Sequence, residues 1–199
     1  MLKKNEIKVL EILCEDFTRD LTITDIAKKL KQKYVQTHKT IYSLEHTKII
    51  TIKSIGKSKI IKIKLDKDVP EYILAERERT NNLCKRNISL AIIKKDIQEV
   101  TKNFICILFG SQTRKPKPQS DIDLLFIIPK EYNLEEFERE VKKKLIARNT
   151  DIVILTENSL HIMWSNPQKL NVGNEILKNH IILYGAEHFF NILRKHNVG

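Results

Sequence analysis

The 199-residue sequence has few of the residues that mark disulfide-rich, zinc-binding or membrane proteins. Its three cysteines, Cys14, Cys84 and Cys106, are odd in number and lack metal-ligand spacing, so we expect neither a disulfide framework nor a zinc site. Cys14 and Cys106 lie among apolar residues, which favours reduced core thiols. No apolar run approaches membrane-spanning length, and the first residues include no apolar signal region. We therefore expect a cytoplasmic protein with no membrane partner.

Glycine is scarce as well, because the chain contains only five. One of them, Gly110, directly follows the apolar, strand-like run of residues 104–109. A residue without a Cβ lets the backbone turn sharply and approach a ligand closely. If a helix begins at Ser111, its free N–H groups would form an anion site suited to a triphosphate.

Two carboxylates open the next apolar run, residues 122–128. Asp121 and Asp123 would point to the same side of a strand, with Ile122 and Leu124 on the other side. Two like charges this close are costly beside an apolar core unless a cation neutralises them. Mg²⁺ is the expected cation, because it takes one or two carboxylates and completes its shell with water and substrate phosphates.

A connector of nine residues joins the Gly-Ser turn to the acidic pair. This combination resembles the signature of the polymerase-β-like nucleotidyltransferase superfamily, and most closely its minimal nucleotidyltransferase branch. The residues that carry the resemblance are Gly110, Ser111, Arg114, Ser120, Asp121 and Asp123. The resemblance covers about half the chain, residues 90–184. It implies a third carboxylate on a later strand, and Asp151 in the run 150–155 supplies one.

The resemblance also implies a reaction, in which an acceptor attacks the α-phosphate of a nucleoside triphosphate, expected to be ATP, and pyrophosphate leaves. Asp121 and Asp123 would bridge two Mg²⁺ ions. Asp151 would complete the shell of the second ion. Arg114 would act as a donor fork on the triphosphate. The nucleotide-binding residues implied are Gly110, Ser111, Arg114 and Ser120.

The first 68 residues show a helix, a short helix, a third helix and a basic hairpin. Apolar stripes place the outer helices at about residues 4–15 and 35–47, and the hairpin turns at Gly56. Val35, Ile41 and Leu44 are the expected inward positions of the third helix. This order resembles the winged helix-turn-helix fold, in which that helix enters the major groove and the hairpin meets phosphates. The DNA-contacting residues implied are Gln36, Thr37, His38, Lys39, Thr40, Ser43, Lys53, Lys57 and Lys59.

The net charge of +11 is unevenly distributed along the chain. Residues 1–68 contain 16 Lys and Arg against 9 Asp and Glu, so they hold +7, and the remainder holds +4. A basic surplus of this kind favours contact with polyanions, above all double-stranded DNA. The alternative is that the winged helix docks proteins and that its lysines keep an exposed hairpin soluble.

The break at Val69-Pro70 divides the chain, because proline lacks a donor and constrains its predecessor. We expect an α+β protein with a winged helix domain at 1–68, a charged helical linker at 69–86 and a nucleotidyltransferase domain at 87–199. The last domain should contain a small mixed sheet flanked by helices at about 87–101 and 131–147. Residues 170–190 should be mainly helical and end with a short strand.

The leading functional hypothesis is a DNA-binding, Mg²⁺-dependent nucleotidyltransferase that moves a nucleotide to a protein or small molecule. Relatives of the branch that it resembles modify proteins with AMP, confer antibiotic modification or serve as antitoxins beside a separate toxin. The alternative is a DNA-binding transcription regulator whose transferase fold only senses nucleotide or is inactive. Three retained carboxylates argue against lost activity, since buried acids are costly without a metal. In a third hypothesis the winged helix recruits a partner protein as acceptor and never contacts DNA. Groove reading would suit a homodimer, although the sequence does not determine the oligomeric state.

Overall fold

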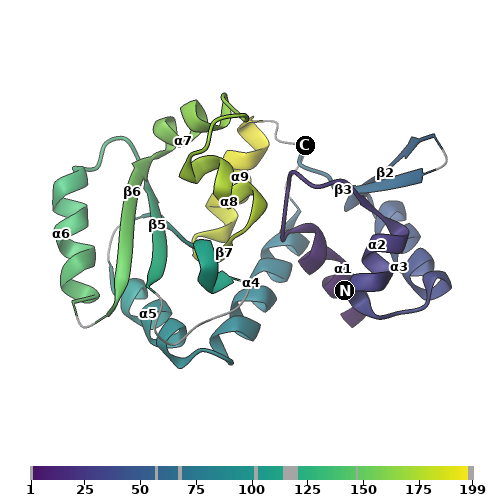
Figure 1. Cartoon of the computed structure of the whole chain (residues 1–199), viewed down its shortest axis with the longest axis horizontal. Coiled ribbons are helices and arrows are strands. Elements are labelled where there is room, and N and C mark those ends of the chain that lie inside the picture. Colours follow the sequence, from purple (N-terminus) through teal and green to yellow (C-terminus); the bar gives the residue numbers. More distant parts are fainter. Residues whose placement is uncertain are drawn as a thin grey trace.

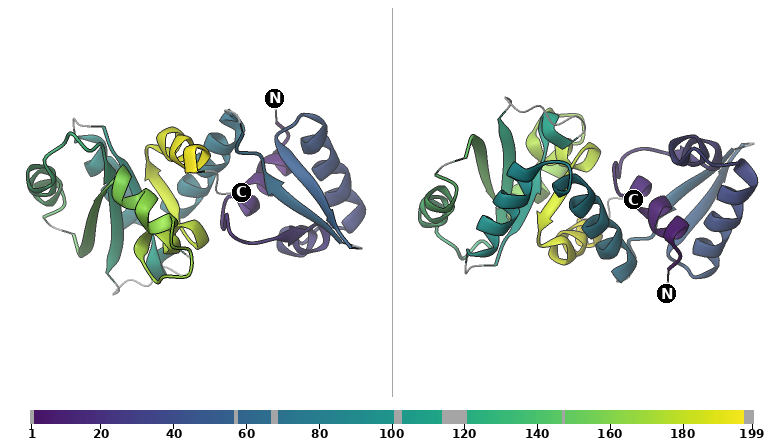
Figure 2. Two further views of the ribbon diagram at one scale, coloured as in Figure 1. Left: turned by 90° about the horizontal axis from the view of Figure 1, so that it is seen from above. Right: turned by 90° about the horizontal axis from the view of Figure 1, so that it is seen from below.

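The fold is taken from a computed structural model, which describes residues 2–56, 58–66, 69–100, 103–113, 121–146 and 148–196. The chain forms an N-terminal unit, residues 2–66, and a C-terminal unit, residues 87–196, on either side of helix α4 (Pro70–Cys84) (Figure 1). The same side-by-side arrangement is seen from above and from below (Figure 2). None of the described helices is both long and apolar enough to span a membrane.

The N-terminal unit combines three helices with a small antiparallel sheet. Its elements are α1 (Lys4–Leu13), β1 (Leu21–Thr22), α2 (Ile23–Leu30), α3 (Tyr34–His46), β2 (Ile50–Ile55) and β3 (Ser58–Ile63). Strand β1 was not predicted from the sequence, and it pairs with β3 to give the order β1-β3-β2. Thr22 caps α2, because its Oγ1 accepts a hydrogen bond from Asp25 N at 3.2 Å.

The inward face of α3 differs from the prediction at two positions. Ile41 and Leu44 are buried as expected, but Val35 is 65% exposed. Thr37 takes the inward place and is fully buried, because it precedes Ile41 and Leu44 by four and seven residues on one helix face. Its Oγ1 lies 3.4 Å from the Lys33 carbonyl oxygen, within the same helix. Thr37 therefore cannot present its hydroxyl to DNA.

The C-terminal unit is built on a four-stranded mixed sheet, which confirms the fold expected for this half. Its elements are α5 (Ile88–Gln98), β4 (Ile105–Leu108), the 3₁₀ helix η1 (Gly110–Thr113), β5 (Ile122–Ile128), α6 (Leu134–Lys144), β6 (Thr150–Thr156), α7 (Glu157–Trp164), α8 (Val172–Lys178), β7 (Ile181–Tyr184) and α9 (Ala186–His196). The strand order is β6-β5-β4-β7, with β5 and β6 parallel and the other pairs antiparallel. Helix α7 was not predicted.

Both faces of strand β5 are buried, and they belong to different layers. Ile122 and Leu124 pack in a cluster with residues of α5 and α6. Leu125 and Ile127, which point the other way, pack in a second cluster with residues of α7, α8 and α9. This alternation is the predicted one, and it places Asp123 on the side of α7, α8 and α9.

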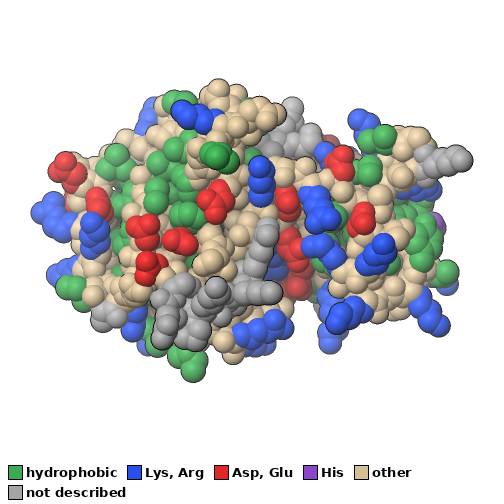
Figure 3. All heavy atoms as spheres, in the orientation of Figure 1, with side chains coloured by type: hydrophobic (Ala, Val, Ile, Leu, Met, Phe, Trp, Pro, Cys, Tyr) green, Lys and Arg blue, Asp and Glu red, His purple; other side chains and the backbone are tan. Residues whose placement is uncertain are grey.

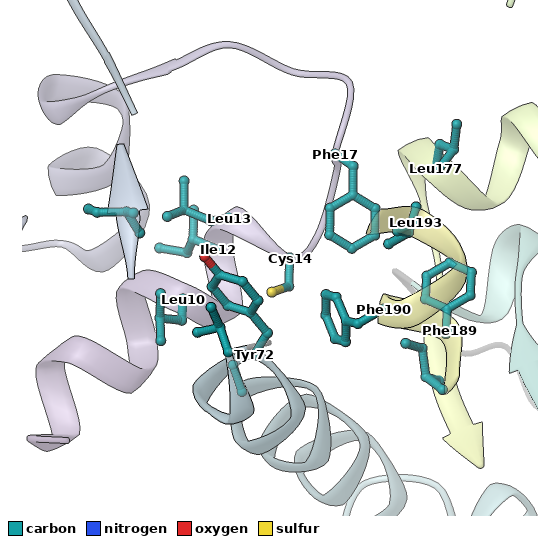
Figure 4. Close-up of a cluster of buried hydrophobic side chains, with 14 of the residues drawn as sticks. Leu10, Ile12, Leu13, Cys14, Phe17, Tyr72, Leu177, Phe189, Phe190 and Leu193 are labelled. Atoms are coloured by element: carbon teal, nitrogen blue, oxygen red, sulfur yellow. The ribbon is translucent and has the colours of Figure 1, made fainter. Parts of the chain in front are cut away.

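Helix α4, which lies in the stretch predicted as a charged helical linker, contributes buried side chains to the core. Its Tyr72 and Ala75 are buried in a cluster that also contains residues of α1 and α9. Figure 4 shows Phe17, Phe189 and Phe190 meeting the side chains of α1 and Tyr72 at this junction. The two units therefore share a continuous buried core.

The charged sequence of α4 includes two polar residues, Glu76 and Arg79, whose side chains are largely removed from solvent. Glu76 is fully buried and pairs with Arg79. Arg79 also donates to the carbonyl oxygens of Cys14, at 2.8 Å, and His180, at 2.7 Å. Burial raises the pKa of the Glu76 carboxyl, and Arg79 opposes that shift. Arg79 thereby joins the N-terminal unit, α4 and the strand region of the C-terminal unit.

Candidate active site

Parallel strands β5 and β6 bring two of the three predicted carboxylates side by side. Asp123 of β5 is the direct neighbour of Asp151 of β6 in the register. Asp121 lies just before β5 and accepts a hydrogen bond from the Asn149 side chain, while Ile122 N donates to the Asn149 carbonyl oxygen at 3.1 Å. Figure 3 shows acidic side chains grouped over β5 and β6 on this face.

The three carboxylates influence one another electrostatically. Partial burial raises the pKa of Asp123, and the negative charges of Asp151 and then Asp121 raise it further. The ionised form of Asp123 is thus disfavoured where the protein supplies no compensating cation. A divalent cation between these groups would remove that repulsion. The three carboxylates are therefore a donor set that fits a divalent cation.

The chemistry of these donors suits a hard divalent ion, because all three are carboxylate oxygens. Over the ranges that the structure describes, however, no three His, Cys, Asp or Glu side chains form a group that could hold a metal ion. The protein side of the site is therefore one neighbouring pair, Asp123 and Asp151, with the exposed Asp121 beside it. Other ligands would have to complete the coordination shell.

Gly110 lies directly against the Asp123 carboxylate. Its φ is +70°, and a Cβ built on it would overlap Asp123 Oδ2. The Phe109 N–H donates to the Asp123 carbonyl oxygen at 3.1 Å, which fixes the distance between the turn and β5. A glycine is required here for two separate reasons, the left-handed backbone and the close approach.

The described part of the turn after β4 is the four-residue 3₁₀ helix Gly110–Thr113, and residues 114–120 lie outside the described residues. Over residues 110–113 no α-helix begins at Ser111, so the anion site that such a helix would supply is not seen there. Ser111 is exposed and so accessible to a ligand, whereas Gln112 is buried. Arg114 and Ser120, predicted to bind nucleotide, lie outside the described residues.

Asn179 is a residue of this site that the sequence did not reveal. Its Nδ2 donates to the Gly110 carbonyl oxygen at 3.1 Å, and its Oδ1 lies 2.7 Å from Thr113 Oγ1. It thereby holds both ends of η1 from the segment between α8 and β7. No local pattern marks it, because the contacts join residues more than sixty positions apart in the chain.

The predicted DNA-contacting residues are only partly available on the surface. Gln36, Lys39 and Lys53 are exposed, and Thr37 is excluded by its burial. Lys57 lies outside the described residues.

Four other predicted DNA contacts are already engaged within the N-terminal unit. The Ser43 hydroxyl donates to Glu6 at 2.8 Å, and the Thr40 hydroxyl donates to the Gln36 carbonyl oxygen at 3.1 Å. His38 stacks on Tyr42 with ring centroids 4.3 Å apart, and Lys59 donates to the Tyr42 hydroxyl. These contacts restrain the four side chains but leave them at or near the surface.

Several further side chains lie in the core. Phe189, Phe190, Ile192 and Leu193 are buried. Trp164 is 4% exposed and donates from Nε1 to the Gly173 carbonyl oxygen at 2.8 Å, so its indole packs in the core. Cys14 and Cys106 are buried free thiols.

The fold and the placement of the carboxylates are those expected of a nucleotidyltransferase domain. Residues 91–187, about half of the chain, match a family model described as Polymerase beta, Nucleotidyltransferase. The matched segment includes the Gly110–Ser111 turn and the three carboxylates, so it supports the superfamily predicted from those residues. Neither the comparison with curated proteins nor that with solved structures gave a match.

Proposed function

We propose that the protein is a Mg²⁺-dependent nucleotidyltransferase that moves a nucleoside monophosphate, expected to be AMP, from a triphosphate to a protein or small-molecule acceptor. The observation that carries this proposal is the pairing of Asp123 with Asp151 on neighbouring parallel strands, with Gly110 packed against Asp123. The family match over residues 91–187 supports the same chemistry.

In this reaction an acceptor hydroxyl forms a bond to the α-phosphorus while the bond to the bridging oxygen breaks, and pyrophosphate leaves with the electron pair. The hydroxyl proton passes to solvent. Asp121, Asp123 and Asp151 would hold two Mg²⁺ ions, which when bound stabilise charge on the attacking and leaving oxygens. Ser111 and Arg114 would bind the β- and γ-phosphates, and Ser120 would fix the turn before Asp121.

The shortage of clustered protein ligands is compatible with magnesium. Mg²⁺ dehydrates reluctantly and is usually held by one or two carboxylates together with water and substrate phosphates. An open set made of Asp123 and Asp151, with Asp121 beside them, therefore suits an ion that arrives with the triphosphate.

The test of the transferase proposal is calorimetric titration of the whole protein with ATP and then GTP, with and without Mg²⁺. We expect Mg²⁺-dependent binding that is lost in an Asp121→Asn/Asp123→Asn variant. No binding to the wild-type protein would overturn the proposal. Binding without turnover on any acceptor would favour the alternative, a regulator that senses nucleotide.

We further propose that residues 1–68 are a winged helix that binds double-stranded DNA, with 69–86 as connecting helix and 87–199 as transferase domain. The order of helices and strands and the three-stranded sheet support this proposal. The exposed Gln36, Lys39 and Lys53 and the charge of +7 in this region support it as well. A homodimer and an antitoxin-like role belong to the same proposal.

The DNA proposal predicts a specific salt dependence. Each phosphate contact on duplex DNA contributes about 0.9 to the slope of log affinity against log salt. We expect Lys39→Gln/Lys53→Gln to lower the magnitude of that slope by roughly 1.8 in fluorescence polarisation with a labelled duplex. The matched control is Lys143→Gln/Lys169→Gln, which removes the same charge from the C-terminal unit. Equal slopes for both variants would favour a protein-docking role.

A further inference from the structure

A polar cavity lies between the two units, beside the candidate active site. We call it the interunit cleft. It has a volume of about 800 Å³, and its walls include the α1–β1 segment, the end of α4 and the end of α8. Thr113 and Asn179, which also contact Gly110, belong to its lining. The interunit cleft therefore adjoins the turn that carries Ser111.

Three cations in the lining of this interunit cleft are exposed and form no close ion pair within the described residues. Arg19, Arg86 and Lys178 make no ion pair or side-chain hydrogen bond with any residue that the structure describes, and Arg19 interacts with Asp25 only at longer range. They come from the α1–β1 segment, the residues after α4 and the last position of α8. Because the three cations come from separate parts of the chain, their presence in the interunit cleft does not result from a single charged helix.

The acidic residues of the lining are occupied by other contacts. Glu15 pairs with Lys29, and Asp16 accepts hydrogen bonds from the backbone and hydroxyl of Thr18, at 2.9 Å and 2.7 Å. Partial burial raises the pKa of Glu11, which disfavours its charged form. With three acidic and five basic side chains in its lining, the cleft has a formal surplus of two positive charges. On the face seen in Figure 3, basic and acidic side chains both gather along the junction between the units.

The walls of the interunit cleft are held together by bonds across the junction. The Phe17 N–H donates to the Leu177 carbonyl oxygen at 2.8 Å, and the Phe17 ring stacks on His180 with centroids 4.9 Å apart. Arg79, itself part of the lining, bonds the carbonyl oxygens of Cys14 and His180. A ligand would thus meet a preformed site and would not have to order it.

We propose that the interunit cleft binds the acceptor of the transfer reaction, and that this acceptor bears phosphate and is about the size of a nucleotide. The volume falls within the range of roughly 300–1,000 Å³ that is typical of small-molecule sites. Arg86 and Lys178 would bind the phosphate, and the arginine fork suits phosphate oxygens. The assignment of this ligand as the acceptor rests on the proposed transferase function, whereas the binding of phosphate in the cleft does not. The expected ligand is a free nucleotide, which is a small-molecule acceptor as proposed above, and the phosphate of a strand end is the other source that the test distinguishes.

The test compares binding of AMP and of labelled single-stranded pentathymidylate by the wild-type protein and by Arg86→Gln/Lys178→Gln. We expect at least one probe to bind the wild-type protein, and the variant to bind it at least roughly 10-fold more weakly. The matched control Arg77→Gln/Lys143→Gln removes the same charge from exposed positions outside the cleft and should bind like the wild type. Binding of AMP identifies a free nucleotide as the source of the phosphate, and binding of pentathymidylate alone identifies a strand end.

Titration with Mg²⁺ and ATP separates this inference from the transferase proposal. The cleft variant should bind ATP as the wild type does, since neither residue belongs to the carboxylate site. An equal loss of ATP and probe binding would overturn the inference, because the two cations would then serve the triphosphate. Equal probe binding by wild type and variant, or no probe binding by the wild type, would overturn it too. Probe binding without ATP binding would leave the cleft as a phosphate site and remove the transferase proposal.

Discussion

Replacing Asp123 by asparagine is expected to slow nucleotidyl transfer strongly while making the metal-free protein slightly more stable. Metal stabilisation of transition-state charge is worth several kcal/mol, so its loss should slow turnover by roughly 10²- to 10³-fold. The stability change has the opposite sign because the substitution removes repulsion from Asp151 and Asp121. At a partly exposed site this repulsion is worth less than about 1 kcal/mol, so the melting temperature should rise by no more than about 2–4 °C.

The pH dependence of the same variant follows from the raised pKa of Asp123. A carboxyl whose pKa is higher in the folded state destabilises the fold when it ionises. The wild type and Asp123→Asn should therefore be equally stable below the ordinary pKa of an aspartate. As the pH rises through the raised pKa of Asp123, the wild type should lose stability relative to the variant. Thermal unfolding in EDTA across this pH range measures the difference.

The control for this experiment is Asp96→Asn, which removes a carboxylate that is attracted by its neighbour and not repelled by it. Asp96 lies 3.3 Å from Arg148 in an attractive ion pair, so its loss should lower stability slightly and leave pyrophosphate release unchanged. If Asp123→Asn destabilised the protein as Asp96→Asn does, the carboxylates would not repel one another as the strand register indicates. Full turnover by Asp123→Asn would contradict its assignment as a metal ligand.

Gly110→Ala is expected to be the most damaging single methyl addition to the transferase unit. The added Cβ would occupy the place of Asp123 Oδ2 at a backbone with φ of +70°. Left-handed strain costs about 1–2 kcal/mol, and overpacking adds about 1–3 kcal/mol. We expect the free energy of unfolding to fall by roughly 2–5 kcal/mol, together with loss of Mg²⁺-dependent ATP binding.

Two other glycines separate the cost of the left-handed backbone from the cost of the overlap with Asp123. Gly56 has φ of +58°, and a Cβ added there would meet nothing within 4 Å, so Gly56→Ala should cost only the backbone strain and leave ATP binding intact. Gly185 has φ of +78°, and its Cβ would meet the Phe104 carbonyl oxygen, so Gly185→Ala should destabilise the sheet away from the carboxylates. Urea unfolding and calorimetry on the three variants give the comparison. Equal effects of Gly110→Ala and Gly56→Ala on ATP binding would show that contact with Asp123 is unimportant.

The sequence alone determined those features that depend on short-range periodicity and on a compact motif. Alternation along residues 122–128 placed Ile122 and Leu124 opposite Asp123, and the structure confirms it, because side chains on a strand must alternate. The isolated Gly110 after an apolar run predicted a sharp turn and close approach to a ligand, and the structure shows a left-handed backbone there with the Asp123 carboxylate packed against it. Carboxylate spacing and the Gly-Ser turn were enough to indicate the superfamily.

Tertiary structure decided everything that depends on contacts between distant segments. Helical periodicity did not distinguish Val35 from Thr37 as the buried residue of α3, because the orientation of a helix is set by what it packs against. The sequence predicted a charged helix at α4 but did not show that Glu76 pairs with Arg79, or that Arg79 bonds the carbonyl oxygens of Cys14 and His180.

The role of Asn179 and the formation of the interunit cleft also depend on contacts between distant segments. Asn179 reaches Gly110 across 69 positions, and the cleft joins Arg19, Arg86 and Lys178 from segments that share no pattern. Hydrogen bonds and cavities of this kind arise only when the chain is folded, since no local spacing brings their members together. The chemistry of the site was therefore readable from neighbouring residues, and its surroundings only from the packing of the two units.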